Sequence, residues 1–165
     1  MKRIVLLSDT HGHFDEKLPK YLEGCDEIWH AGDIGNLSVT DELKKYAMLR
    51  AVYGNIDNHQ ARAEFDEKIR FPLEGFDVLM THIGGKPYAY SKNIVNELNF
   101  NPPQIFICGH SHILRVEYDK KRNFLYLNPG ACGLHGFHKV KTLLRFTLDK
   151  GNIKDMEVVE LGPRA

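Results

Sequence analysis

Short apolar runs that stop abruptly at polar residues or glycine recur along the first two-thirds of the chain. Runs of this length, rich in β-branched residues, are typical of buried strands. They predict strands at residues 3–7, 27–30, 48–53 and 105–108. They also predict a hairpin that joins residues 69–73 to residues 76–80 through a Glu-Gly turn.

Apolar residues at helical spacing predict helices at residues 14–23, 38–46 and 92–98, with Ser38 or Thr40 as the N-cap of the second. Pro19 weakens the middle of the first helix. The remaining pattern is all-β, with strands expected at residues 114–118, 124–128, 142–149 and 153–161. Helices that alternate with strands, followed by antiparallel strands, predict an α/β fold in which one sheet is layered against another. We expect a single domain over residues 1–165.

Composition narrows the class of protein. The chain has 22 basic and 22 acidic residues, and 42% of its residues are hydrophobic, which is ordinary for a globular protein and indicates no nucleic-acid or membrane partner. Its three cysteines are too far apart for a disulfide framework or a cysteine zinc site. The first apolar run ends at Leu7, too early for a secretory leader, and no run approaches the roughly 20 apolar residues of a membrane span. These features predict a cytoplasmic protein.

Candidate chemistry gathers where the predicted strands end. The motifs D-T-H, G-D, G-N, T-H and G-H-S-H each follow one predicted strand. Ligands of open α/β sheets bind at the carboxyl ends of strands, so these motifs are expected to converge. Their carboxylate, amide and imidazole groups suit divalent Mn, Fe, Co, Ni or Zn. The residues concerned are Asp9, His11, Asp33, Asn55, His82, His110 and His112.

Any one of these motifs has a simpler interpretation. A D-x-H or G-D pair is commonly a capped turn or a surface pair, and G-N is commonly just a turn, although a glycine before Asp33, Asn55 or His110 also allows the tight turn that would aim each ligand. A lone histidine is more often hydrogen-bonded than bound to a metal. Five such motifs in order, each at a predicted strand end, favour a metal site.

This series resembles the signature of the calcineurin-like metallophosphoesterases, and the resemblance covers essentially the whole chain. The short chain and its N-P-G-A-C segment at residues 128–132 resemble the small bacterial and archaeal phosphodiesterase branch of that family. The resemblance implies a four-layer α/β/β/α sandwich with two divalent metal ions, Mn ahead of Ni, Zn, Fe or Co. It implies that one metal is held by Asp9, His11, Asp33 and His112. It implies that the second is held by Asp33, Asn55, His82 and His110, so that Asp33 bridges the two.

Two positions depart from the family pattern. Many members have a histidine directly after G-N as a proton donor, where this chain has Ile56. Asp57 fits the acidic position that follows, and His59 is a candidate substitute, so the expected catalytic residues are Asp33, Asn55, Asp57 and His59. Many members also have a second histidine two residues after the one that matches His82, where this chain has Gly84.

The implied reaction is hydrolysis of a small phosphate ester by a hydroxide that bridges two metals. Without a histidine at Ile56, a poor alkoxide leaving group is less well protonated, so we expect diesters to be hydrolysed faster than alkyl monoesters. A non-catalytic scaffold on the same fold is the alternative. An amidohydrolase built around H-x-H is a further alternative, disfavoured because that architecture needs about 250 residues. A homo-oligomer is compatible with the sequence.

Four histidines outside these motifs have other expected roles. His13 is expected to be exposed near a helix start, and His30 to pack or hydrogen-bond at the end of its strand. For His135 and His138, in a glycine-rich loop, a solvated position and a place at the edge of the substrate are equally open, and the resemblance implies that the loop beginning at residues 128–132 comes near the metals. Tyr88 and Tyr90 are expected either at a pocket rim or on the surface.

Overall fold

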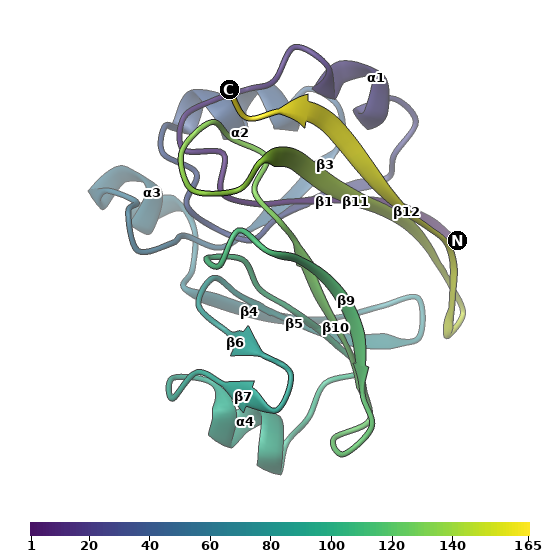
Figure 1. Cartoon of the computed structure of the whole chain (residues 1–165). Helices are drawn as coiled ribbons and strands as arrows, with labels where there is room; N and C mark the ends of the chain where they lie inside the picture. The colour runs from purple at the N-terminus through teal and green to yellow at the C-terminus, as the bar shows by residue number, and fades with distance from the viewer.

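Two five-stranded sheets packed face to face form the centre of the computed structural model, which describes all 165 residues (Figure 1). The first sheet has the order β12-β11-β1-β2-β3 and the second the order β4-β5-β8-β10-β9. A two-stranded hairpin, β6–β7, lies outside both. The elements are β1 (Lys2–Leu7), α1 (Leu18–Leu22), β2 (Glu27–His30), α2 (Leu37–Lys44), β3 (Met48–Ala51), α3 (His59–Glu64), β4 (Lys68–Leu73), β5 (Phe76–Thr81), β6 (Gly85–Lys86), β7 (Ala89–Tyr90), α4 (Val95–Phe100), β8 (Ile105–Ile107), β9 (Leu114–Asp119), β10 (Phe124–Pro129), β11 (Val140–Asp149) and β12 (Asn152–Pro163).

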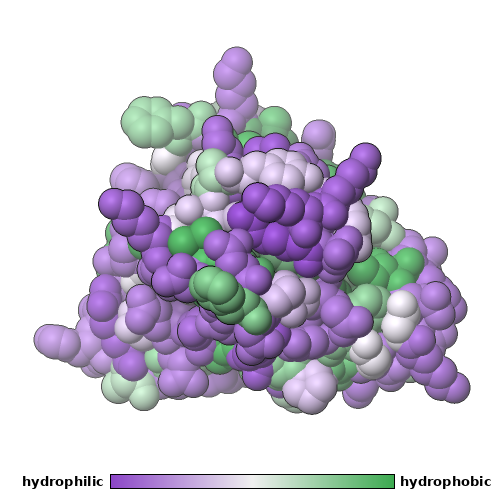
Figure 2. Space-filling view, turned by 90° about the horizontal axis from the view of Figure 1, so that it is seen from below, coloured by the Kyte–Doolittle hydropathy of each residue, from purple (hydrophilic) through white to green (hydrophobic).

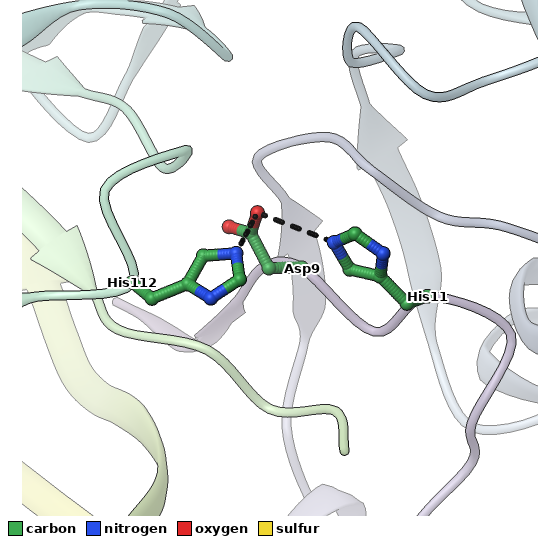
Figure 3. A group of neighbouring side chains, drawn as sticks. All are labelled: Asp9, His11 and His112. Carbon is green, nitrogen blue, oxygen red and sulfur yellow. Dashed lines mark ion pairs between the residues drawn. The ribbon is translucent and has the colours of Figure 1, made fainter. Parts of the chain in front are cut away.

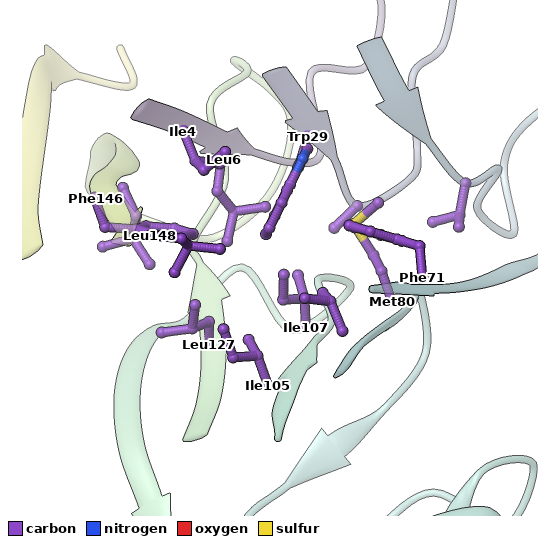
Figure 4. Packing of buried hydrophobic residues seen from close by; sticks show 14 residues of the cluster. Ile4, Leu6, Trp29, Phe71, Met80, Ile105, Ile107, Leu127, Phe146 and Leu148 are labelled. Carbon is purple, nitrogen blue, oxygen red and sulfur yellow. The ribbon is translucent and has the colours of Figure 1, made fainter. Parts of the chain in front are cut away.

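The apolar runs are continuous because the central strands are buried on both faces. In β1, Ile4 and Leu6 belong to a cluster of 14 buried residues between the two sheets, around Trp29 (Figure 4). Val5 and Leu7, which point the other way, belong to a second cluster. Successive residues of a strand point to opposite faces, so a strand covered on both sides needs apolar residues at every position.

Helices cover the outer face of each sheet. Leu18 and Leu22 of α1 and Val39 and Leu43 of α2 are fully buried against the outer face of the first sheet. Leu98 of α4 is buried in a third cluster, on the outer face of the second sheet. The predicted four-layer α/β/β/α sandwich is therefore confirmed.

The first predicted helix is much shorter than expected. Only Leu18–Leu22 is helical, and Pro19 lies in its first turn, where proline is tolerated, rather than in its middle. The residues before it form a turn in which the carboxylate of Asp15 accepts a hydrogen bond from the backbone amide of Lys17, 2.9 Å away.

The second helix starts one residue earlier than predicted, and its N-cap is neither Ser38 nor Thr40. Asn36 has extended backbone angles, and its side-chain oxygen accepts a hydrogen bond of 2.9 Å from the amide of Ser38. Asparagine is among the best N-cap residues because its oxygen satisfies an amide that has no partner within the helix. The predicted helix at residues 92–98 is displaced towards the C-terminus and occupies Val95–Phe100.

Two elements were not predicted. The short helix α3 begins after Asn58, whose side chain accepts hydrogen bonds from the amides of Gln60 and Ala61. The strands of the β6–β7 hairpin have two residues each, too few to show a pattern. No helix of the structure is long and apolar enough to cross a membrane.

The strand directions bring the polar motifs to one edge of the sandwich. In the first sheet β1, β2 and β3 run parallel, and in the second sheet β5 and β8 run parallel. The motifs follow these five strands directly, and the main chain links them across the edge. The amide of Asp9 donates to the carbonyl of Gly32 at 2.9 Å, and the amide of Gly109 donates to the carbonyl of His82 at 3.0 Å.

Candidate metal centre

The structure gathers six of the seven predicted ligands into two adjoining groups. In each group the possible ligand atoms all lie within 4.8 Å of one another. Figure 3 shows the first group, with the side chain of Asp9 between two imidazoles. The first group consists of Asp9, His11 and His112, and the second of Asp33, His82 and His110. The seventh residue, Asn55, adjoins the second group, since its Oδ1 lies 3.0 Å from Nδ1 of His110.

Asp33 lies between the two groups. Its Oδ2 is 3.4 Å from Nε2 of His11 and 3.2 Å from Nε2 of His82, which belong to different groups. Its other oxygen accepts a hydrogen bond of 3.1 Å from the amide of Ile56. One carboxylate oxygen is thus held by the main chain, and the other faces both groups.

Buried polar atoms without hydrogen-bond partners are concentrated here. Only four buried side-chain nitrogen or oxygen atoms in the chain lack such a partner, and three of them are Oδ1 of Asp9, Nε2 of His11 and Nε2 of His82. Leaving a buried polar atom unpaired costs roughly 1–3 kcal/mol. Oδ1 of Asp9 lies 3.9 Å from each of the other two atoms, so all three face one small space. These residues fit bound cations, which would satisfy the unpaired atoms of both groups.

Hydrogen bonds on the far side of the ligands fix their orientation. Nδ1 of His82 is 2.7 Å from the carbonyl oxygen of Ala31, so it carries the proton and leaves the lone pair of Nε2 directed at the cluster. Oδ2 of Asp9 accepts hydrogen bonds from the hydroxyl of Ser8 at 2.6 Å and the amide of His110 at 3.2 Å. Only Oδ1 of Asp9 is left for a cation.

The backbone is strained at most of the predicted ligands. Left-handed φ angles are uncommon for residues other than glycine, and their clustering is typical of functional sites. Ten such residues occur in the chain, and half of them are predicted ligands. These five are Asp9 (φ 54°), His11 (φ 45°), Asp33 (φ 56°), His110 (φ 71°) and His112 (φ 61°).

The glycines of the G-D, G-N and G-H motifs make room for ligands from other strands. A Cβ atom at Gly32 would lie 2.6 Å from Nδ1 of His82, and one at Gly109 would lie 2.7 Å from Oδ2 of Asp9. A Cβ atom at Gly54 would overlap the carboxylate of Asp33. Of these three glycines only Gly32 has a left-handed φ, so only the G-D motif needs its glycine for a tight turn.

Charge within the cluster shifts the pKa values of its members. Burial opposes ionisation of Asp9 and Asp33, yet their imidazole neighbours hold the pKa of both carboxyls well below the usual range. The nearby carboxylates of Asp33 and Asp9 raise the pKa of His11 to about 9. Burial lowers the pKa of His82, but Asp33 and Asp9 outweigh it and raise that pKa. Without a cation, a proton on His11 offsets part of the carboxylate charge, so a cation that binds this imidazole must displace that proton.

Two of the predicted catalytic residues have contacts that do not support a direct role. Both oxygens of Asp57 accept hydrogen bonds from backbone amides: those of Ile34 at 3.1 Å, Gly35 at 2.9 Å and Gly54 at 2.8 Å. These contacts hold together the loops that carry Asp33 and Asn55. His59 is exposed at the start of α3, and its side chain has no hydrogen bond or ion pair with the two groups. It therefore gains no support as a substitute proton donor.

His30 has the hydrogen-bonded position predicted for it. It is fully buried, with Nε2 3.0 Å from the hydroxyl of Thr10 and Nδ1 accepting from the amide of Gly32 at 3.1 Å. His13 lies outside both groups, half-buried, with Nε2 3.7 Å from Oδ2 of Asp15.

Two histidines that sequence reasoning left unassigned lie against the first group. The ring of His135 stacks on that of His11, with centroids 4.9 Å apart and planes 28° apart. The ring of His138 meets that of His112 edge-on at 5.2 Å, and its Nε2 hydrogen-bonds the carbonyl of Gly133 at 2.8 Å. No spacing rule connects these two histidines to the motifs, and the signals in the sequence were the glycine-rich loop and the resemblance that places this loop near the metals.

The structure explains why no histidine stands at Gly84. A Cβ atom there would lie 2.7 Å from Cβ of Cys108 and 2.8 Å from the ring of Phe106. Both neighbours are fully buried, so a side chain cannot be added without moving the outer face of the second sheet.

A cavity of about 450 Å³ opens over both groups. Volumes of this size are typical of small-molecule sites. Exposed apolar side chains of Ile56, Ile113 and Phe137 contribute to its wall. The remaining lining residues are His11, Asp33, Asn55, His110, Ser111, His112, His135, Gly136 and His138.

Comparison with known proteins gives a family and a fold. Residues 1–151 match the model of the calcineurin-like phosphoesterase superfamily domain. A probable metallophosphoesterase of Mycoplasma pneumoniae is 29% identical over 162 residues, which are 94% of this chain and 96% of that protein. An archaeal phosphodiesterase superposes with a TM-score of 0.73 at 21% identity, over 96% of this chain and 99% of that one. Vps29 of Chaetomium thermophilum superposes with a TM-score of 0.76 at 12% identity, over 97% of both chains.

Proposed function

The chain belongs to the calcineurin-like phosphoesterase superfamily, and we propose that it hydrolyses phosphodiesters with the help of two divalent cations, Mn²⁺ first among them. The observation that carries this proposal is the placement of Asp33, whose free oxygen faces one imidazole of each ligand group. Each group alone resembles a site for one cation, and a carboxylate between them fits a bridge.

The proposal gives each ligand a role. Asp9, His11 and His112 would hold one cation, and His82, His110 and Asn55 the other, with Asp33 shared. Bound cations would act as Lewis acids towards phosphate oxygens and lower the pKa of water to produce a nucleophile. The chain's own contribution is to orient the ligands. The carbonyl of Ala31 fixes the tautomer of His82, and the amide of Ile56 holds Oδ1 of Asp33 so that Oδ2 faces the two groups.

Diesters are preferred in this proposal because of the wall of the cavity. Ile56 is exposed at the cavity and has no proton to give, so a strongly basic alkoxide would leave without help from that position. Ile113 and Phe137 are exposed on the same wall and offer apolar surface to the organic groups of an ester.

A scaffold without catalytic activity is the second candidate function. Structural similarity to Vps29 and the fully exposed ring of Phe137 favour it. Three buried atoms of Asp9, His11 and His82 lack hydrogen-bond partners and argue for a cation instead, because such atoms are costly to keep without one.

Reconstitution followed by assay tests the proposal. After loading with Mn²⁺ or Ni²⁺ and removal of excess metal, elemental analysis should approach two cations per chain. The loaded protein should hydrolyse bis(p-nitrophenyl) phosphate faster than glycerol phosphate at the same pH. Less than one cation per folded chain would refute the paired site. A preference for glycerol phosphate would refute the diester assignment, and two cations without hydrolysis would favour the scaffold.

A further inference from the structure

A second cavity, of about 300 Å³, adjoins the first. Both cavities are lined by His110, Ser111 and Ile113, so they meet at the turn after β8 that carries two of the predicted metal ligands. We call the second one the cationic cavity. Its other lining residues are Gly85, Lys86, Ala89, Ser91, Gly109, Arg115 and Tyr126.

The cationic cavity is lined by positive charge and hydrogen-bond donors. Lys86 and Arg115 line it, and no carboxylate does. Lys86 has no ion-pair partner in the chain. Arg115 contacts Glu117 through Nε at 3.2 Å and Nη2 at 2.9 Å, which leaves Nη1 available. Charged and neutral donors without acceptors are the chemistry that recognises an anion.

Two serine hydroxyls add donors. The side chain of Ser91 has no hydrogen bond within the chain. The hydroxyl oxygen of Ser111 accepts from the amide of Ile113 at 3.2 Å and from Nδ2 of Asn128 at 3.1 Å, so its own proton is free. Figure 2 shows the face that carries β6, β7 and α4, where hydrophilic side chains dominate and apolar ones are scattered. This surface suits a charged small group better than an apolar protein partner.

The hairpin that carries Lys86 is anchored at several points. The carbonyl of Gly85 accepts a hydrogen bond of 2.7 Å from the hydroxyl of Tyr126. The hydroxyl of Tyr90 donates to Asp119 at 2.7 Å, and that of Tyr88 accepts from the amide of Lys120 at 3.2 Å. Tyr88 and Tyr90 therefore fix the hairpin rather than line a pocket, and the backbone of Lys86 is held at the cavity.

We propose that the cationic cavity binds an anionic group, a carboxylate or a phosphate, on one ester arm of the substrate. The inference rests on the proposed function, in which the cations held by the two ligand groups would act on the scissile phosphate. A diester has two arms, and two cavities meet at residues 110–113. One arm then enters the cavity walled by Ile56 and Phe137, and the other, which carries the anion, reaches Lys86 and Arg115. The preferred substrates are diesters with a second negative group.

A matched pair of esters tests this inference. p-Nitrophenyl phenyl phosphate and p-nitrophenyl 4-carboxyphenyl phosphate release the same phenol and differ only in the carboxylate. The Mn²⁺-loaded protein should have a kcat/KM about two- to fivefold higher for the carboxylated ester, as expected for partly exposed ion pairs. Lys86→Gln combined with Arg115→Gln should abolish the difference, whereas Lys44→Gln combined with Lys45→Gln, an equal change of charge at the exposed C-terminal end of α2, should not. Equal kcat/KM values for the two esters in the unaltered protein would overturn the inference.

A binding measurement separates this inference from the proposed hydrolysis. Metal-free protein is titrated with inorganic phosphate and followed by amide NMR. The amides of Lys86 and Ser91 should shift, and the shifts should disappear in the Lys86→Gln, Arg115→Gln variant. Absence of shifts at these residues, or shifts that persist in the variant, would overturn the inference. Hydrolysis of neither ester would refute the proposed function, and the titration would then decide about the cavity alone.

Discussion

Gly54 packs against Asp33 so closely that a methyl group on its Cα would overlap the carboxylate. The φ angle of Gly54 is not in the left-handed region, so alanine is compatible with its backbone and the effect of substitution falls on Asp33. We expect Gly54→Ala to lower activity at least about tenfold, roughly 1.4 kcal/mol of barrier, and to reduce cation content. Elemental analysis and circular dichroism check both the loss and the retained fold.

Gly151→Ala is the control, because it strains the backbone without crowding a neighbouring side chain. Nothing lies within 4 Å of a Cβ atom at that position, but its φ is +84°. The substitution should cost roughly 1–2 kcal/mol of unfolding free energy and leave the cation content unchanged. Equal cation loss in both variants would show that crowding at Asp33 is not the cause.

Asp33→Asn keeps the shape of the side chain but removes the charge between the two ligand groups. Two like-charged cations would then lie close together with less negative charge between them. We expect a loss of at least about 100-fold in rate, about 2.7 kcal/mol of barrier, with cation content falling to one or none. Asp41→Asn, on the exposed side of α2, is the matched control. Two cations and near-full activity in Asp33→Asn would remove Asp33 from the bridging position.

Asp57→Ala should act on stability. Three backbone amides donate to this carboxylate, and removing it leaves them unpaired, at a cost of roughly 2–3 kcal/mol of unfolding free energy. Urea unfolding of the metal-free protein measures this without interference from cation binding. Unchanged stability together with lost activity would instead support the catalytic role predicted for Asp57 from the sequence.

His30 should make the metal-free protein less stable in acid. Burial lowers the pKa of His30 to about 4, against about 6.5 in an unfolded chain. Between these values the unfolded chain binds more protons, so this contribution is complete above about pH 6.5 and is lost as pH falls towards 4. Its upper limit is roughly 3 kcal/mol.

Comparison with a variant isolates this contribution from the other histidines. The unfolding free energy measured with urea should fall more between pH 7.5 and pH 5 in the unaltered protein than in His30→Gln. An NMR titration that placed the imidazole pKa of His30 above 6 would contradict the expectation without depending on the variant.

The ligand groups could be predicted from the sequence because each ligand follows a local apolar pattern. An apolar run marks a strand, and Asp9, Asp33 and His82 each follow one directly. Parallel pairing then brings them to one edge. The contacts of Asp57 were not accessible, since the amides that bind it belong to Ile34, Gly35 and Gly54, in two different loops. A motif position identifies a residue but not the direction of its side chain.

The misplaced and missed features depend on local hydrogen bonds or on tertiary packing, which hydrophobic periodicity does not register. The helix expected at residues 14–23 loses its first turn to a hydrogen bond from the amide of Lys17 to the carboxylate of Asp15, a local competition that periodicity does not register. The helix α3 has six residues and is stabilised by the cap at Asn58 more than by an apolar face, so its pattern is weak. His135 approaches His11 only because the chain returns to the site after β10, which depends on tertiary packing.

Each ligand group takes side chains from both halves of the sandwich. Asp9 follows a strand of the first sheet and His112 a strand of the second, and the same holds for Asp33 and His82. A cation bound to either group would therefore link the two sheets, and its set of ligands would be complete only when both sheets have formed. Pulling the two sheets apart would require breaking coordination bonds at one edge before the apolar interior parts. The centre proposed for chemistry would then also add to the apolar contacts that join the two sheets.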